Sequence, residues 1–356
     1  MIPWRDRRER LTHLTEIRMN FATFKFGLVA TLTGVALAQT TLHTTTTLVV
    51  VPTVVQTPGR ELVFSLSAGD FTLTDNGVAQ KVTLEEEANR PLSLVVLMQT
   101  GGAARGQFVN YANLETMLAA MLGKAPNKAS IVNFDSRPEA ASPFTSDIAE
   151  WRDAINHPDE GDSGAAILDS ISYGIGLLNQ QPRNTRRAIL LISQEYDSGS
   201  KTSLKDVVRD LGETNTAIYS MTFSAEKTSF KQAFKDPPHL NPPITVNPAA
   251  GPIQGYFNLS APLALALGGM RKNLSAEAAR LSGGETSSFD SRNQLEEGIG
   301  MLTNHIRNSY LLSFYPTSAT PGLHTIKVGL AHHPELVVSA RGNYWAADST
   351  KTETQH

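Results

Sequence analysis

One apolar run, Leu92 to Met98, constrains the fold of this chain more than any other stretch. The run is rich in Leu and Val and does not alternate with polar residues, which is typical of a strand buried on both faces at the centre of a parallel sheet. A glycine-containing turn, Gln99 to Ala103, ends it, and a helical pattern follows from Val109 to Leu122. This order places the turn at the carboxyl edge of the sheet, where open α/β sheets bind their ligands.

The residues of this turn do not match a nucleotide-binding site or a nucleophile elbow. Its glycines, Gly101, Gly102 and Gly106, do not form the G-x-G-x-x-G pattern of a dinucleotide site, and no P-loop Lys-Ser/Thr follows them. A nucleophile elbow needs a Ser or Cys at the turn, and the turn has neither. The turn therefore carries no motif for nucleotide binding or acyl transfer.

The segments that follow alternate between strands and helices. The pattern predicts strands over Ala129–Asp135, Arg187–Ser193, Ala217–Phe223 and Glu285–Phe289, and helices over Asp147–Ile155, Ala165–Leu178, Leu204–Leu211, Ser275–Ser282 and Asn293–Asn308. Such alternation indicates an α/β fold with a doubly wound, mainly parallel sheet and helices on both faces. We expect this domain to span residues 91–308.

A proline-rich stretch interrupts the alternation. Seven of the 19 prolines fall between Pro237 and Pro262, which excludes regular helix or central strand there. We expect residues 225–270 to form a long inserted loop. Loops of that length are usually either functional or disordered.

Both ends of the α/β region have β-strand patterns. Thr40–Thr57 reads as one or two strands interrupted by Pro52 and Pro58, and Asp75-Asn76-Gly77 indicates a hairpin turn. Beyond the last helix we expect three strands in an antiparallel meander, over Tyr310–Tyr315, His324–Leu330 and Leu336–Arg341. Because each group is too small to fold alone, we expect segments 39–90 and 309–346 to form one small β-sandwich, with the α/β domain inserted between them. Residues 347–356 read as a polar tail.

The N-terminus has the three elements of a signal peptide. A basic stretch precedes the apolar run Phe26–Leu37, and Ala36-Leu37-Ala38 supplies a cleavage site before Gln39. The run is too short for a membrane span, and an N-terminal core helix is the alternative. We expect residues 1–38 to be removed and the mature chain to be exported to the periplasm, the cell envelope or the medium. Met19 is a better start than Met1, because it gives a basic region of ordinary length.

Net charge and residue composition argue against several classes of partner and cofactor, among them nucleic acids, anionic membranes and cysteine-bound metals. A formal net charge of −3 gives no electrostatic case for nucleic acid or anionic membranes. The chain has no cysteine, which excludes disulfides, thiol nucleophiles and Cys-based metal sites. Its nine histidines show no H-E-x-x-H or paired metal spacing. We expect no integral membrane span in the mature chain.

Several stretches together resemble a known family. They are LSAGDFTLTDNGVAQKV, RPLSLVVLMQTGG, AILDSISYGIGLL, RAILLIS, and SYLLSFYP followed by ARGNYW, and they extend over most of residues 45–346. Their order is similar to that of exported von Willebrand factor A-like proteins abundant in Acidobacteria. The resemblance implies a von Willebrand A fold that binds proteins and is not an enzyme.

The resemblance also locates the metal-ion-dependent adhesion site of such domains. The family's Asp-x-Ser-x-Ser, Thr and Asp ligands fall here on residues without a carboxylate or hydroxyl oxygen: Gln99, Gly101, Ala103, Ala165 and Gln194. Mg²⁺ depends on anionic oxygen ligands. We therefore expect a degenerate site that holds no metal and no other cofactor.

Three functional hypotheses stay open. The first is an exported, non-enzymatic protein–protein interaction module that binds a protein partner without metal. The second is the same fold with a divalent cation such as Mg²⁺ at a displaced site, although acidic residues more often cap helices or face solvent. The carboxylates for such a site are those of Asp135, Asp169, Glu195 and Asp197. The third is an envelope enzyme with a cleft beneath the 225–270 loop, supported only by the length of that loop.

Overall fold

The computed structural model describes residues 48–85, 90–123, 126–182, 184–225, 228, 273–317 and 320–346. The expected signal peptide and the expected tail lie outside these residues. So does the expected insertion, apart from Ala225 and Thr228. Within the described ranges, no helix is both long and apolar enough to cross a membrane.

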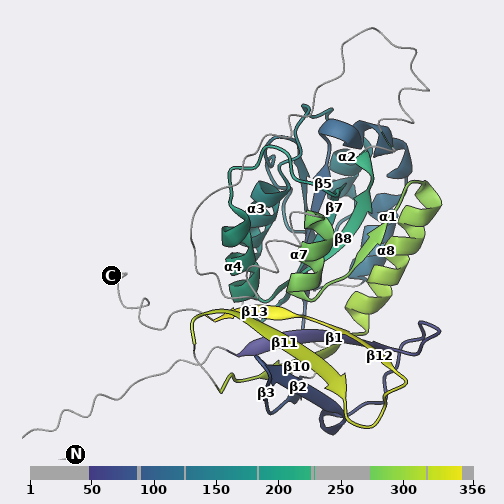
Figure 1. The fold of residues 1–356 in the computed structure, drawn as a ribbon. Coiled ribbons are helices and arrows are strands. Elements are labelled where there is room, and N and C mark those ends of the chain that lie inside the picture. Colours follow the sequence, from purple (N-terminus) through teal and green to yellow (C-terminus); the bar gives the residue numbers. More distant parts are fainter. Residues whose placement is uncertain are drawn as a thin grey trace, which may run out of the picture. The chain divides into compact units, whose positions relative to one another are not determined.

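A five-stranded parallel sheet forms the centre of the α/β region, with strand order β6-β5-β7-β8-β9 (Figure 1). The strands are β5 (Leu92–Gln99), β6 (Lys128–Phe134), β7 (Arg186–Gln194), β8 (Thr216–Phe223) and β9 (Thr286–Ser288). Every residue of β5 is buried, as the apolar run predicts. The parallel α/β fold class expected from the alternation is confirmed.

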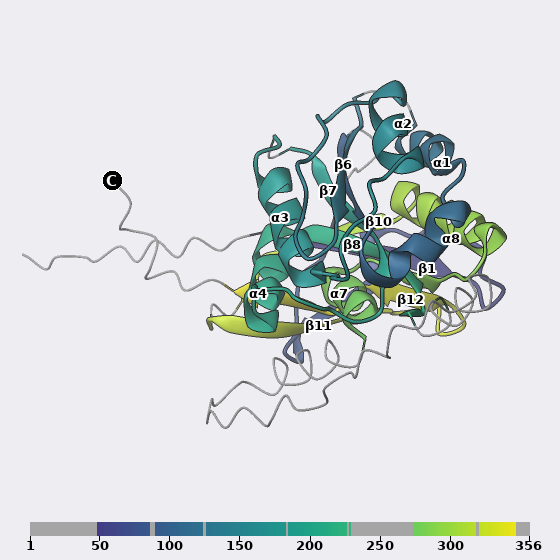
Figure 2. The same ribbon diagram turned by 90° about the horizontal axis from the view of Figure 1, so that it is seen from above.

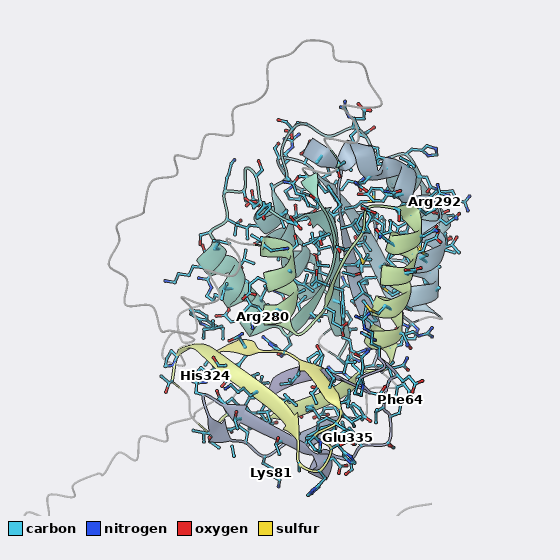
Figure 3. All side chains as sticks on the ribbon, turned by 45° about the vertical axis from the view of Figure 1, so that its right-hand side comes forward. Phe64, Lys81, Arg280, Arg292, His324 and Glu335 are labelled. Atoms are coloured by element: carbon cyan, nitrogen blue, oxygen red, sulfur yellow. The ribbon has the colours of Figure 1, made fainter. Side chains whose placement is uncertain are left out.

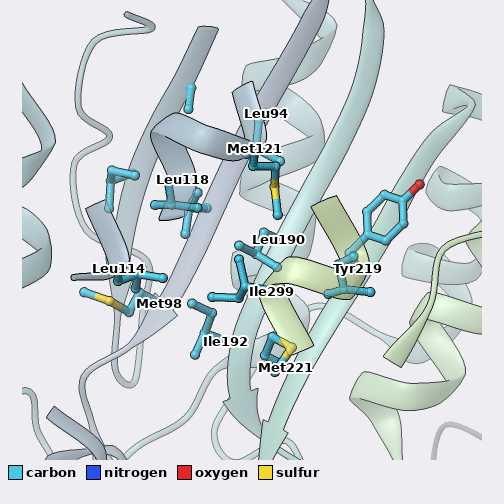
Figure 4. Packing of buried hydrophobic residues seen from close by; sticks show 14 of the residues in the cluster. Leu94, Met98, Leu114, Leu118, Met121, Leu190, Ile192, Tyr219, Met221 and Ile299 are labelled. Atoms are coloured by element: carbon cyan, nitrogen blue, oxygen red, sulfur yellow. The ribbon is translucent and has the colours of Figure 1, made fainter. Parts of the chain in front are cut away.

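Helices cover both faces of this sheet (Figure 2). On one face lie α1 (Leu114–Leu122), α2 (Ala149–Asn156) and α8 (Arg292–Arg307), and on the other lie α3 (Ile167–Asn179), α4 (Leu204–Thr214) and α7 (Leu274–Ser282). Strand β5 contributes alternate residues to the two cores, because successive strand side chains point to opposite faces. Leu94 and Met98 pack with Leu114 and Leu118 of α1 in the first core (Figure 4), and Val95 packs in the second.

The helix expected over 109–122 is shorter than its pattern predicts. A 3-10 helix, η3 (Gly102–Asn110), follows the turn, and α1 begins only at Leu114. Asn113, just before α1, has a φ of 68°, a left-handed conformation that asparagine tolerates better than most residues. The expectation was wrong here because one residue with positive φ breaks an otherwise continuous apolar pattern.

Two four-stranded antiparallel sheets form the β-sandwich, with orders β12-β1-β10-β4 and β13-β11-β2-β3. The strands from the N-terminal segment are β1 (Val49–Gln56), β2 (Phe71–Asp75), β3 (Val78–Ala79) and β4 (Thr83–Glu85), with η1 (Ala68–Asp70) before β2. Those from the C-terminal segment are β10 (Tyr310–Phe314), β11 (Gly322–Leu330), β12 (Val337–Ala340) and β13 (Asn343–Ala346). Each sheet contains strands from both segments, which confirms one sandwich with the α/β region inserted between its halves.

The C-terminal strands do not form the expected meander. Successive strands alternate between the sheets, because each sheet has an N-terminal strand that pairs with them: β1 lies between β10 and β12, and β2 lies beside β11. A fourth strand, β13, was not predicted. The structure therefore corrects both the strand number and the connectivity of this segment.

Two local features of the N-terminal segment follow from backbone chemistry. Asn76 and Gly77 have φ values of 48° and 86° in the turn between β2 and β3, as the hairpin prediction requires. Strand β1 runs through Pro52 without a break, because Pro52 lies opposite Leu311 of β10 whereas pairing with β12 begins only at Thr53. Proline is tolerated where a strand is paired on one side.

Candidate functional site

Three loops converge at the carboxyl edge of the parallel sheet. Loop one (residues 100–113) follows β5, loop two (157–166) precedes α3, and loop three (195–203) follows β7. Gly102 N donates to Asp162 O at 2.8 Å, which joins loops one and two. Ala165 and Ser198 exchange two backbone hydrogen bonds of 2.9 and 2.8 Å, which join loops two and three. The loops that the sequence assigns to an adhesion site are therefore neighbours in space.

Glycines allow these loops to touch through their backbones. A Cβ atom on Gly101 would overlap Gly164 O and lie 2.7 Å from Asp135 Cβ. A Cβ on Gly161 would lie 2.8 Å from Gly101 N, and one on Gly164 would lie 2.6 Å from Ser136 Cα. Only glycine fits such close approach. The role of Gly161 and Gly164 was not predicted, although the Gly-Asp-Ser-Gly run at 161–164 indicates a tight loop.

Gln99 and Gln194 bind each other at the centre of the site. Gln99 is fully buried. Its Nε2 donates to Gln194 Oε1 at 3.1 Å and to Gly101 O at 2.9 Å, and its Oε1 accepts from Gln194 N at 2.8 Å. The Nε2 of Gln194 donates to Tyr196 O at 2.8 Å. This amide pair, as we call it, joins the ends of β5 and β7 to loops one and three without any charge.

The other adhesion-site positions offer no side-chain oxygen. Gly101 has no side chain, Ala103 lies within η3 and packs against the first core, and the Ala165 methyl is buried. The carbonyl oxygens of both glutamine amides already accept hydrogen bonds, from Gln194 N and from Gln99 Nε2. A hard divalent cation requires several oxygen ligands, usually including carboxylates. These residues do not fit one.

Three of the four carboxylates expected for a displaced site accept hydrogen bonds from backbone N–H groups of neighbouring segments. Asp135 accepts from Asp162 N at 3.1 Å, Asp169 from Thr202 N at 2.7 Å, and Asp197 from Leu168 N at 3.0 Å. The fourth, Glu195, is half-buried, and its backbone oxygen accepts from Leu274 N at 2.9 Å. Across the described residues of the chain, no group of three or more His, Asp or Glu side chains is placed to hold a metal ion.

The hydrogen bonds to Asp169 also change its acidity. Desolvation raises the pKa of this carboxyl, but the hydrogen bonds from Thr202 and from Lys201 N outweigh it, and the net pKa is lowered. A lowered pKa means that the folded protein favours the carboxylate form. The charge of Asp169 thus stabilises the contact between the first turn of α3 and loop three.

Around this neutral centre the edge exposes apolar and charged side chains. Tyr196 is 52% exposed and Val109 is 59% exposed. The Gln194 amide holds the carbonyl of Tyr196, so the position of this aromatic residue is tied to the amide pair. Arg105 of loop one and Glu160 of loop two form an ion pair of 2.9 Å at the surface. The edge is therefore a packed, preorganised surface.

Among the described residues two histidines are buried, and both are engaged elsewhere. In the sandwich, His324 (Figure 3) contacts Asp75 Oδ1 through Nδ1 at 2.7 Å and Thr320 O through Nε2 at 2.6 Å. In α8, His305 contacts Glu285 Oε2 through Nδ1 at 2.7 Å, and its Nε2 lies 2.8 Å from Gln56 Nε2. Both imidazoles are at least 90% buried and have polar neighbours at both nitrogens. Neither belongs to the loops at the carboxyl edge.

Comparison with known proteins gives similarity at the level of solved structures. No family model matches the sequence, and no curated protein matches it. An aerotolerance-related membrane protein from Bacteroides fragilis is 15% identical, with 60% of this chain and 98% of that chain covered and a TM-score of 0.35. BatB from Bacteroides thetaiotaomicron is 11% identical, with 61% and 99% covered and a TM-score of 0.37. The VWA domain of SpRpn10 is 14% identical, with 40% and 82% covered and a TM-score of 0.31.

All three TM-scores are below 0.5. The fold rests on the strand order and register of the chain itself. This chain is similar to proteins that include a von Willebrand A domain, and its own α/β region is a parallel, doubly wound sheet with helices on both faces.

Proposed function

We propose that this chain is a non-enzymatic protein–protein interaction module that binds its partner at the carboxyl edge of the parallel sheet without a metal ion. The observation that carries the proposal is the amide pair of Gln99 and Gln194. In an adhesion site of the family that the sequence resembles, a cation joins the loops and receives a partner carboxylate. Here two neutral side chains join the same loops. Contacts to a partner must then come from the surface around them.

The geometry of the edge supports binding of a protein. Its loops are fixed by backbone hydrogen bonds and by glycine contacts, so little conformational entropy is lost when a partner binds. Tyr196 is exposed on this rigid frame. Tyrosine is enriched among the residues that dominate binding energy, because its ring supplies apolar area and its hydroxyl a hydrogen bond. We assign Tyr196 as the central contact.

The displaced cation site is the weaker proposal. Asp135, Asp169 and Asp197 each accept backbone N–H groups from neighbouring loops. A cation bound by them would compete with the hydrogen bonds that hold those loops together. An enzymatic role is also weaker. At this edge the Ser200 hydroxyl donates to Asp197 Oδ1 at 2.6 Å, but the same oxygen accepts from Leu168 N, so the pair fixes the loops. The pattern of residues 1–38 supports the further proposal that the module acts outside the cytoplasm.

The experiment is affinity capture from the native envelope fraction, in EDTA and in millimolar Mg²⁺. The same partner should be captured in both buffers, and binding should fall by at least tenfold for Tyr196→Ala, the usual size of a hot-spot truncation. The control is Val78→Ala, since Val78 is 56% exposed on the sandwich. Capture only with Mg²⁺ would refute metal independence. If Tyr196→Ala binds as well as the parent, Tyr196 is not a central contact and the partner binds away from the carboxyl edge.

A further inference from the structure

Arg341 is a buried cation between the sandwich and the α/β region. It lies between β12 and β13 and is only 1% exposed. Its Nη2 donates to Leu211 O at 3.0 Å and Gly212 O at 2.9 Å, and its Nη1 donates to Asn215 Oδ1 at 2.9 Å. Its Nε donates to Asn343 O at 2.6 Å on its own segment. The Arg341 guanidinium thus links the end of α4 to the start of β13 through hydrogen bonds to both.

The acceptors in α4 are those that a helix end leaves free. The last four carbonyls of a helix have no partner within it, and they carry the partial negative charge of the helix dipole. Helix α4 ends at Thr214, and Asn215 follows with a φ of 50°. Burial lowers the pKa of Arg341 to about 10, which still leaves the side chain charged at neutral pH. The planar fork of arginine matches two adjacent carbonyls, whereas lysine offers a single point of charge.

Backbone contact around Arg341 is unusually close. A Cβ atom on Gly212 would overlap Trp345 Cβ and lie 2.9 Å from Trp345 Cα. Gly283, which ends α7 with a φ of 85°, has space for no Cβ, because that atom would lie 2.6 Å from Arg341 Cβ. The C-terminal ends of α4 and α7 therefore pack directly against the segment that contains Arg341 and β13.

We propose that Arg341 is a conformational latch that joins the sandwich and the α/β region into a single cooperative unit. If β13 separated from α4, the guanidinium would lose its acceptors on Leu211, Gly212 and Asn215, and the helix end would lose its cap at the same time. Hydrogen bonds to a charged donor contribute more to stability than those between neutral groups, so the joint loss of these bonds disfavours the separation. The sandwich then holds the α/β region in a fixed position. This proposal does not depend on which partner binds at the carboxyl edge.

The test compares Arg341→Met with Arg280→Met in the full chain. Methionine keeps apolar volume and removes all donors. Arg280 (Figure 3) is the matched control, since it also lies beside this junction but is 55% exposed and pairs with Glu277 of its own helix. The readouts are calorimetry and hydrogen exchange of individual amides. The parent and R280M should unfold in one transition with equal calorimetric and van't Hoff enthalpies.

For R341M, the transition should split in two. Amides of β13 and of the last turn of α4 should exchange about ten- to a hundredfold faster, while those of β5 and β7 keep their protection, as expected from the loss of charged hydrogen bonds. A single transition with equal loss of protection throughout would show that Arg341 is an ordinary core residue, and would overturn the proposal.

If R341M does not fold, exchange in the parent at low urea decides the question. The latch requires β13 amides to open with the same free energy and the same urea dependence as β5 amides. Opening of β13 at a lower free energy than β5 would overturn it.

Discussion

The imidazole Nδ1 of His324 lies 2.7 Å from the Oδ1 of Asp75, a contact between residues 249 positions apart in the sequence. The Tyr344 hydroxyl donates to the other oxygen of Asp75 at 2.7 Å. All three side chains are almost completely buried. A polar network inside the sandwich thus joins β2 of the N-terminal segment to β11 and β13 of the C-terminal segment. Asp75 finds the partners for both of its carboxylate oxygens only when the two segments come together.

Replacing Asp75 should therefore destabilise the fold strongly. In Asp75→Ala, His324 and Tyr344 would stay buried without their acceptor, and loss of one partner from such a network typically costs about 3 kcal/mol or more. The measurement is urea denaturation at pH 7. The control is Asp159→Ala, because Asp159 is exposed and its replacement should change stability by less than about 0.5 kcal/mol. Equal stability of D75A and the parent would show that the network contributes nothing.

Tyr111 gives a prediction that depends on pH. Its hydroxyl is buried and has no hydrogen-bond partner in the described ranges, and desolvation raises its pKa well above the usual 10. A raised pKa in the folded state means that the associated stability is present below about pH 10 and is lost as the pH rises further, since the unfolded chain then ionises first. Tyr111→Phe removes both the orphan hydroxyl and the ionisation.

We expect Tyr111→Phe to be as stable as the parent at pH 7, or up to about 1 kcal/mol more stable, because an unpaired buried hydroxyl is unfavourable. Its advantage should grow between pH 10 and 12. Denaturation curves across that range check this, with Tyr315→Phe as the control because Tyr315 is 63% exposed. A constant difference at all pH values would contradict the role of ionisation.

Gly101 and Gly176 form a matched pair for the backbone contact at the carboxyl edge. A Cβ on Gly101 would collide with Gly164 O, whereas one on Gly176, inside α3, would meet nothing within 4 Å. Gly101→Ala should destabilise the protein by about 2 kcal/mol, since a collision with backbone forces the loops apart. Gly176→Ala should stabilise it by about 0.5–1 kcal/mol through helix propensity. Thermal melts of the two variants should shift in opposite directions, and a shared direction would refute the contact.

The sequence predicted the features whose cause is local. The apolar run of β5 fixes a buried central strand, and Asn76-Gly77 fixes a hairpin, because both depend on neighbouring residues. The same alignment of patterns placed Gln99 and Gln194 in two loops of one site. It did not predict that they bind each other. That contact depends on β5 and β7 being adjacent in the sheet, which only the folded chain determines.

Strand β13 was missed for a different reason. It has four residues, too few for a clear alternating pattern, and its place depends on Arg341 just before it. Arginine is rarely fully buried, so its sequence position suggests a surface turn. Burial of this residue depends on acceptors that include the free carbonyls at the end of α4, which no local pattern of 337–346 reveals.

The amide pair gives the last prediction, made with the double variant Gln99→Asp, Gln194→Asp. The change removes the hydrogen bonds between the two amides and places two carboxylates close together at a partly buried edge, where like charges repel. We expect a loss of about 3 kcal/mol at pH 7, since the buried network is broken and charge is added. The loss should become smaller as the pH falls below about 4 and the carboxyls are protonated.

Mg²⁺ should not restore the stability of this variant. Gly101, Ala103 and Ala165 supply no oxygen, and serine cannot replace Gly101 without displacing Gly164. Restoring all five ligands of the resembled family is therefore not compatible with the present loop backbone. Thermal melts in EDTA and in millimolar Mg²⁺ should coincide for the parent, for the double variant and for the exposed control Gln180→Asp. A rise of several degrees with Mg²⁺ in the double variant alone would show that two carboxylates suffice to make a cation site. A rise in the parent would show that the chain binds the cation as it stands, at the amide pair or at the displaced carboxylates, and would count against metal-independent recognition.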